Sequence, residues 1–199
     1  MQRRDALRFL AATAALPVLH GLTPHELLAL GRKVHELAEA SEAIHTLSAH
    51  QNRTVVVASE RIIPATDTPG ASAARVNRFI DAMLTGWYSP DDRDRFLVGL
   101  AELDDRSRKA HGVSFVDCTP TQQTALLLAL DDKVAALRRA AAMSRSSDTS
   151  GPANPDEHWF AMLKYLTIWG YYTSEVAQTR ELRLYPLPGR YDGCAPYSR

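Results

Sequence analysis

Three short segments each combine turn-forming residues with aromatic or apolar residues and one carboxylate. They are the places where the chain could do chemistry: IIPATDTPGA with Asp67, GYYTSEV with Glu175 and PGRYDGC with Asp192. Asp67 and Glu175 could serve as a general acid and a general base if the fold brings them together. The alternative is structural, with each carboxylate accepting backbone N–H bonds in a corner or a helix cap. This alternative is stronger for Asp67 than for Asp192, because Tyr191 and Asp192 follow no regular element that they could complete.

The usual cofactor and catalytic motifs are missing from the sequence. It contains no G-x-G-x-x-G, P-loop, H-E-x-x-H, C-x-x-C or G-x-S-x-G, which argues against a nucleotide, flavin, zinc or c-type haem site in this chain. One E-x-x-H occurs, Glu42 with His45, whereas a di-iron bundle needs two. Cys118 could act as a thiol nucleophile only through the start of the following helix. We interpret the remaining acidic runs as solvated helix faces: Asp91, Asp92, Asp94, Asp104, Asp105, Asp131 and Asp132.

Composition predicts a single all-α domain. The 199 residues suffice for one core, and 23 basic residues balance 23 acidic ones. This neutral balance supplies no basic field for nucleic acid. Alanine and leucine dominate while strand-like runs are scarce, so we expect one compact multi-helix domain over residues 23–182. An N-terminal signal-like segment, residues 1–22, and an extended Pro/Gly-rich tail, residues 183–199, flank it.

Capping residues predict where the helices begin, because a Ser or Thr side chain can accept a free N–H of the first turn. The predicted N-caps are Thr23, Ser48, Ser72, Ser89 and Thr119. Gly112 is expected to end the helix that Ser89 starts. The triplet Val55-Val56-Val57 favours a strand, but the apolar spacing around it also fits a helix that ends before Pro64, which we prefer. Between Thr68 and Ala71 we expect a type II turn with Gly70 at positive φ.

The last predicted helix, residues 155–179, is aromatic nearly all round. A helix that is apolar on most faces is buried, either in its own core or against a partner. Gly170 in its middle weakens the helix, so we expect it to permit the close approach of another backbone. A polar linker over residues 144–157 precedes this helix.

The N-terminus predicts export. Arg3-Arg4 precede a short Ala-rich apolar run that ends at Leu19, a pattern typical of a twin-arginine signal. An ordinary amphipathic first helix is the alternative. In an exported protein Cys118 and Cys194 could form one disulfide or bond to another chain, whereas in the cytoplasm both would stay free.

Four ordered motifs, taken together, resemble a known family. RRDALRFLA, IIPATDTPGA, LTIWGYYTSEV and PGRYDGC follow one another as in the small subunit of gluconate 2-dehydrogenase, called subunit 3. The resemblance runs from Arg3 to about Pro196 and is weakest over residues 51–59 and in the linker.

The resemblance implies a non-catalytic helical subunit without a cofactor of its own. Its partner would be a large FAD-dependent dehydrogenase of the glucose-methanol-choline type, which oxidises a sugar, sugar acid or glycoside in the periplasm. Electrons would pass to a haem c subunit, a cytochrome at the membrane, and the complex would hold this chain there. The small subunit would carry the twin-arginine signal and assist export, assembly and stability of the flavoprotein.

On this interpretation the three segments form the surface that binds the flavoprotein. The expected contact residues are Pro64, Asp67, Thr68, Pro69, Gly70, Trp169, Tyr171, Tyr172, Glu175, Arg190, Tyr191 and Asp192. Aromatic anchors of this kind are typical of interface centres. Two alternatives remain: an independent periplasmic enzyme that uses Asp67 and Glu175, and an assembly protein without a dehydrogenase partner.

Overall fold

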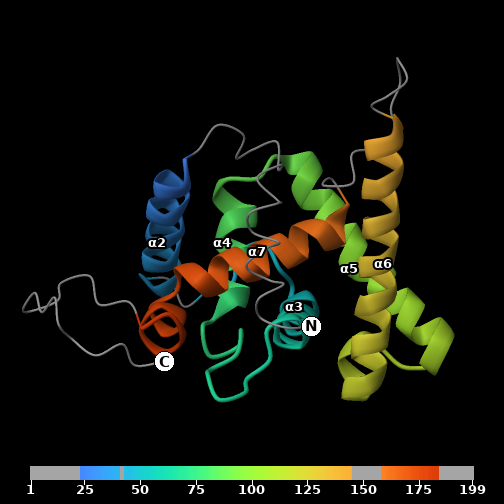
Figure 1. The fold of residues 1–199 in the computed structure, drawn as a ribbon. Coiled ribbons are helices and arrows are strands. Elements are labelled where there is room, and N and C mark those ends of the chain that lie inside the picture. Colours follow the sequence, from blue (N-terminus) through green and yellow to red (C-terminus); the bar gives the residue numbers. More distant parts are fainter. Residues whose placement is uncertain (1–22, 41–42, 145–157, 184–199) are drawn as a thin grey trace, which may run out of the picture.

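The computed structural model describes residues 23–40, 43–144 and 158–183. Within these ranges the chain is all-helical, as the composition predicts (Figure 1). The α-helices are α2 (Pro24–Ala40), α3 (Ala49–Ile62), α4 (Val76–Gly86), α5 (Pro90–His111), α6 (Pro120–Ser144) and α7 (Trp159–Thr173). A 3-10 turn, η2 (Phe115–Asp117), and a π-helical turn, η4 (Ala177–Glu181), complete the described elements. No helix in this part of the chain is both long and apolar enough to cross a membrane.

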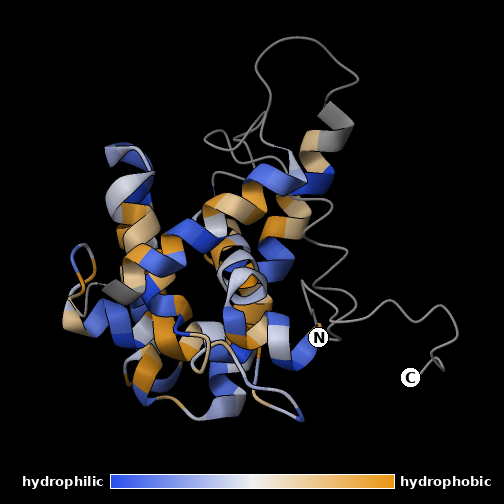
Figure 2. Cartoon of the chain, turned by 90° about the vertical axis from the view of Figure 1, so that its left-hand side faces the viewer, coloured by the Kyte–Doolittle hydropathy of each residue, from blue (hydrophilic) through white to orange (hydrophobic). Residues whose placement is uncertain are grey.

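Helix α7 runs through the middle of the domain and contacts each of the five other α-helices in the described part of the chain (Figure 1). Each of its 15 residues is buried, so the aromatic helix packs in the chain's own core. Coloured by hydropathy, the other helices carry hydrophobic and hydrophilic residues on different sides (Figure 2). The apolar sides surround α7, because burying them is the main favourable contribution to folding.

Two glycines let aromatic side chains pack closely between α7 and its neighbouring helices. A Cβ on Gly99 of α5 would lie 2.0 Å from Cγ of Trp159, and one on Gly170 would lie 2.6 Å from Cδ1 of Phe79. The expected close approach at Gly170 is therefore made by an aromatic ring of α4 and not by another backbone. His35 of α2 also reaches this point, with Nε2 2.6 Å from the Gly170 carbonyl oxygen.

Local capping signals predict most helix starts correctly. Capping boxes join Thr23 with Glu26, Ser48 with Gln51, and Thr119 with Gln122. Ser89 caps α5, and Gly112 ends it with φ of 78°. The segment with the valine triplet is helical, as we preferred.

Two local predictions around α4 are wrong. Ser72 does not cap α4, which begins at Val76 after Arg75 adopts the left-handed conformation with φ of 50°. The Ser72 N–H instead donates to Glu60. Gly70 has no positive φ, so the turn before α4 is not the expected type II turn.

The last predicted helix also differs from the prediction, because α7 ends at Thr173 and Ser174 has extended backbone angles.

Two buried carboxylates hold the chain between helices. Asp81 of α4 is 2% exposed and accepts the backbone N–H groups of His45, Thr46 and Leu47 at 2.8–2.9 Å. Asp104 of α5, expected on a solvated face, is only 5% exposed, which corrects that expectation. Burial is tolerated there because Asp104 accepts hydrogen bonds from the His50 ring and the Phe115 N–H.

Candidate partner-binding site

The loop between α3 and α4 is held at both ends by one carboxylate, that of Glu60 in the last turn of α3. Its Oε1 accepts the Ala65 N–H at 2.9 Å and its Oε2 accepts the Ser72 N–H at 2.8 Å. Gly70 is needed for this arrangement, because a Cβ there would lie 2.3 Å from Glu60 Oε1 and 2.5 Å from the Ala65 nitrogen. The loop IIPATDTPGA is therefore a clamped corner.

Two of the three sequence segments meet at this loop. The Tyr171 hydroxyl lies 2.6 Å from the Pro69 carbonyl oxygen and 2.7 Å from Glu181 Oε2. The Tyr172 hydroxyl donates to Glu181 Oε1 at 3.1 Å. Both rings come from the end of α7, and their centroids are 5.2 Å apart in an edge-to-face arrangement. The hydrogen bond of Tyr171 to Pro69 thus joins the loop between α3 and α4, the clamped loop, to the GYYTSEV segment.

Sequence reasoning missed the two carboxylates that organise this junction, Glu60 and Glu181. Glu60 is an ordinary helix residue until the loop folds back on it. Glu181 reaches the tyrosines only because the chain turns at Ser174 into the π-helical turn, η4. Neither residue shows a local spacing signal, since each contact depends on the path of the chain after a helix ends.

The predicted contact residues divide into exposed and buried sets. Pro64 is exposed at the start of the loop, Asp67 is exposed at its tip, and Glu175 is exposed just after α7. Asp67 accepts a hydrogen bond from the Thr66 hydroxyl at 2.7 Å. Pro69 and Thr68 are half-buried, and the Thr68 hydroxyl has no hydrogen-bond partner in the described part of the chain.

The aromatic members of the predicted interface lie inside the fold. Trp169, Tyr171 and Tyr172 are 4%, 0% and 8% exposed, and Trp169 donates its indole N–H to the Leu27 carbonyl at 3.2 Å. Of these three rings, that of Tyr171 contacts the loop, through its hydroxyl and the Pro69 carbonyl. The surface that a partner could touch here consists of the loop tip and the exposed residues after α7, among them Leu182. Arg190, Tyr191 and Asp192 lie outside the described residues, so the interface stays a prediction.

The residues that could form a catalytic, metal or disulfide site are the carboxylate pair Asp67 and Glu175, clustered metal-ligating side chains, and the two cysteines. Asp67 and Glu175 are both exposed, and neither lines the pockets beside Arg61, Asp104 and Asp81. No group of three potential metal-ligating side chains occurs in the part of the chain that the structure describes. Cys118 is buried as a free thiol with Sγ 2.9 Å from the Ser107 hydroxyl, while Cys194 lies outside the described residues. A disulfide between Cys118 and Cys194 therefore stays a prediction.

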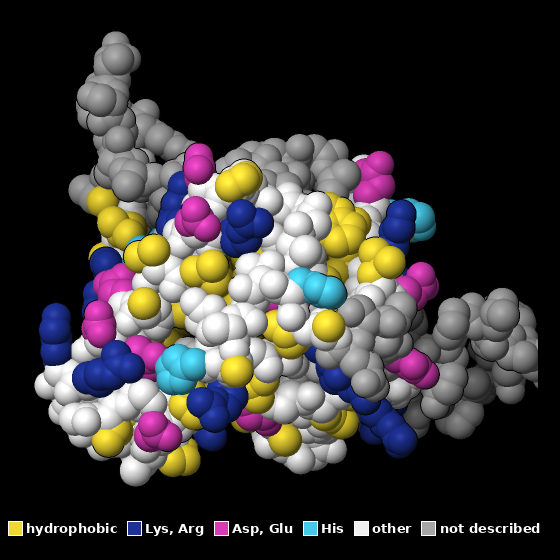
Figure 3. All heavy atoms as spheres, turned by 180° about the vertical axis from the view of Figure 1, so that it is seen from behind, with side chains coloured by type: hydrophobic (Ala, Val, Ile, Leu, Met, Phe, Trp, Pro, Cys, Tyr) yellow, Lys and Arg dark blue, Asp and Glu magenta, His cyan; other side chains and the backbone are white. Residues whose placement is uncertain are grey.

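The electrostatics of the surface are mixed. On the face shown in Figure 3, lysines and arginines are interspersed with acids, and small apolar areas lie between them.

The geometry defines an all-α domain in which the loop between α3 and α4 is held by Glu60 and contacted by Tyr171 of the central helix. The family described as Gluconate 2-dehydrogenase subunit 3 matches residues 49–189, which include both the loop and α7, and the chain belongs to this family. No curated protein and no solved structure matches the chain.

Proposed function

We propose that the chain is the accessory small subunit of a periplasmic FAD-dependent dehydrogenase complex. The partner is a flavoprotein of the glucose-methanol-choline type that oxidises a sugar, sugar acid or glycoside and passes electrons to a membrane cytochrome c. The chain assists export, assembly and stability of this flavoprotein. The carrying observation is the family match over residues 49–189.

The geometry of the loop supports a binding role. Glu60, Gly70 and Tyr171 fix the loop before any partner arrives, so little conformational entropy would be lost on binding. The exposed part of the loop, from Pro64 to Asp67, is the first contact surface, and Glu175 belongs to the same proposed surface. Arg190, Tyr191 and Asp192 would extend it.

The test is to produce the flavoprotein with and without this chain and to measure periplasmic flavin and dehydrogenase activity. We expect the flavoprotein to co-purify with the tagged chain and to accumulate in the periplasm only when the chain is present. Equal export and activity without the chain, and no co-purification, would contradict the proposal. Turnover by the purified chain alone would support the alternative enzyme that uses Asp67 and Glu175.

A second test separates export from stability. Replacing Arg3 and Arg4 by lysine impairs a twin-arginine signal while leaving the charge unchanged. If the chain escorts its partner, this double variant should hold both proteins in the cytoplasm. A flavoprotein that still reaches the periplasm would restrict the role of the chain to assembly or stability.

A further inference from the structure

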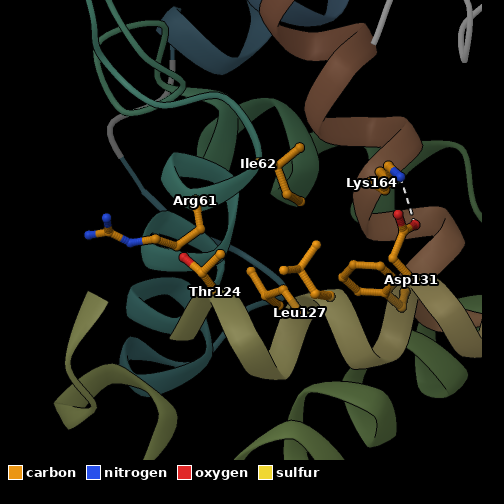
Figure 4. Close-up of a pocket in the computed structure, with 8 residues that line it drawn as sticks. Arg61, Ile62, Thr124, Leu127, Asp131 and Lys164 are labelled. Carbon is orange, nitrogen blue, oxygen red and sulfur yellow. Dashed lines mark hydrogen bonds and ion pairs between the residues drawn. The ribbon is translucent and has the colours of Figure 1, made fainter. Parts of the chain in front are cut away.

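An apolar cleft lies on the surface between α3 and α6, with α7 as its floor (Figure 4). Its walls are Ile62, Leu127 and Leu128, and its floor includes the buried ring of Phe160. The cavity volume is about 120 Å³. A cavity of roughly 150 Å³ accommodates a benzene molecule, whereas sites for whole cofactors or drug-sized ligands are about 300–1,000 Å³. The cleft therefore fits one apolar side chain.

Arg61 marks one end of the cleft and is held in place by Gln123. The Arg61 Nε donates to Gln123 Oε1 at 3.1 Å. Gln123 is 4% exposed, and its amide nitrogen donates to the carbonyls of the η2 turn, at 2.9 Å to that of Cys118. This anchoring fixes the guanidinium through its Nε. Its terminal nitrogens have no acceptor among the residues that the structure describes.

Lys164 and Asp131 mark the opposite end. Lys164 Nζ lies 2.6 Å from Asp131 Oδ1, and the lysine side chain is 5% exposed. In Figure 4 the apolar side chains lie between this pair and Arg61, whose guanidinium points away from them. Because Asp131 offsets Lys164, the charge of Arg61 is the uncompensated one at the rim. It favours an occupant with a carboxylate next to its apolar group.

The cleft is continuous with the clamped loop. Arg61 and Ile62 are the last residues of α3, and the loop begins at the next residue. Leu128, on the lip of the cleft, is 55% exposed, which is unusual for a leucine beside an apolar hollow. A partner that touches the loop tip would therefore have the cleft within reach.

We propose that the cleft between α3 and α6 receives one apolar side chain of the flavoprotein subunit, while a neighbouring carboxylate of the same segment pairs with Arg61. This inference rests on the proposed function and extends the binding surface from the loop to α6. The apolar side chain is the anchor, because it loses water on entering the cleft. The carboxylate fixes the orientation of the segment and speeds association.

The test uses the full chain and the purified flavoprotein that co-purifies with it. Leu128→Asp and Arg61→Glu should each weaken binding about tenfold or more, because they place a negative charge at the lip and at the cation site. The matched controls are Val98→Asp, an exposed apolar residue on α5, and Arg53→Glu, an exposed arginine on α3. Both controls should keep the affinity within about twofold, since neither residue lines the cleft. Helical content and unfolding temperature verify that each variant folds.

The outcomes distinguish this inference from the proposed function. The inference is supported if the two cleft variants bind more weakly while the two controls bind normally. The affinity of Arg61→Glu should also depend less on salt than that of the wild type. Normal binding by both cleft variants overturns it but leaves the proposed function intact. A wild-type chain that binds no flavoprotein overturns both. Sedimentation of the chain alone identifies another occupant: a dimer that Leu128→Asp dissociates would mean that a second copy fills the cleft, which also overturns the inference.

Discussion

Helices α6 and α7 follow one another in the chain and are both rich in apolar residues, yet the fold uses them in opposite ways. All 15 residues of α7 are buried. Along the 25 residues of α6, one stripe with Leu127, Leu130 and Val134 is buried while Leu128 is 55% exposed. Figure 1 shows α7 crossing the domain and α6 at its edge. Aromatic content therefore marks the centre of the core here, whereas the loop after α3 and α6 both present exposed residues.

The largest expected effect tests how tightly α7 is enclosed. Gly99→Ala should lower the free energy of unfolding by about 2–3 kcal/mol, because the new methyl group would displace Trp159. Gly86→Ala is the control, since a Cβ there meets nothing within 4 Å, and it should cause no loss. Urea denaturation measures both values. Equal effects of the two substitutions would show that α5 and α7 are not in close contact.

The next effect concerns the ion pair that joins α6 to α7. Asp131→Asn should lower the free energy of unfolding by about 1–2 kcal/mol, since Lys164 is almost completely buried while Asp131 is partly exposed. Adding Lys164→Met should restore most of the loss, because the buried charge is then removed. Asp105→Asn, which breaks an exposed pair with Arg108, is the control and should change stability by less than about 0.5 kcal/mol. A similar loss of stability for Asp105→Asn would contradict the view that the pair with the buried lysine stabilises the fold more than the exposed pair does.

A smaller effect should appear as a pH dependence at the start of α7. Burial lowers the pKa of His158, and Lys133 nearby lowers it further. The neutral ring accepts the Phe160 N–H through Nδ1 at 3.2 Å. Because the folded pKa lies below the unfolded value of about 6.5, the contribution to stability is complete above that pH and is lost as the pH falls through the folded pKa.

The variant His158→Asn keeps an N-cap acceptor but does not titrate. Unfolding measured between about pH 7.5 and 5 should therefore have a shallower slope for the variant than for the wild type. If the free energy of unfolding depends on pH in the same way for both proteins, His158 does not cause the pH dependence.

The smallest effect is expected on the exposed side of α6. Leu128→Asp should change the free energy of unfolding by less than about 0.5 kcal/mol, because the side chain already contacts water. Its neighbour Leu127 is 6% exposed, and Leu127→Ala should be destabilising by about 2 kcal/mol or more. If Leu128→Asp destabilises the chain as much as Leu127→Ala does, the Leu128 side chain belongs to the core and the cleft is not a binding surface.

Sequence patterns predict the parts of this fold that depend on neighbouring residues. The N-caps at Ser48, Ser89 and Thr119 and the stop at Gly112 need only contacts within a turn or two of helix, so they are visible in the sequence. The all-α class follows for the same reason. Ser72 fails as a cap because α4 begins only at Val76, after Arg75 in the left-handed conformation, and its N–H binds Glu60, twelve residues earlier, a contact that no local pattern contains.

The candidate site shows the same division. The sequence identifies the loop and the two tyrosines as unusual but does not show that Tyr171 contacts Pro69, 102 residues away. The buried state of Asp104 was missed because its partners His50 and Phe115 come from two other elements. The cleft beside Arg61 depends on the packing of three helices and on a contact with Gln123, 62 residues away.

The carboxylate of Asp81 has a consequence for the motions of the domain. The three amides that it binds, those of His45, Thr46 and Leu47, lie outside any helix and would ordinarily exchange hydrogen with water quickly. Here they can exchange only when the segment before α3 separates from α4. Their exchange rates therefore report how often these two parts of the domain come apart, although the segment has no secondary structure of its own.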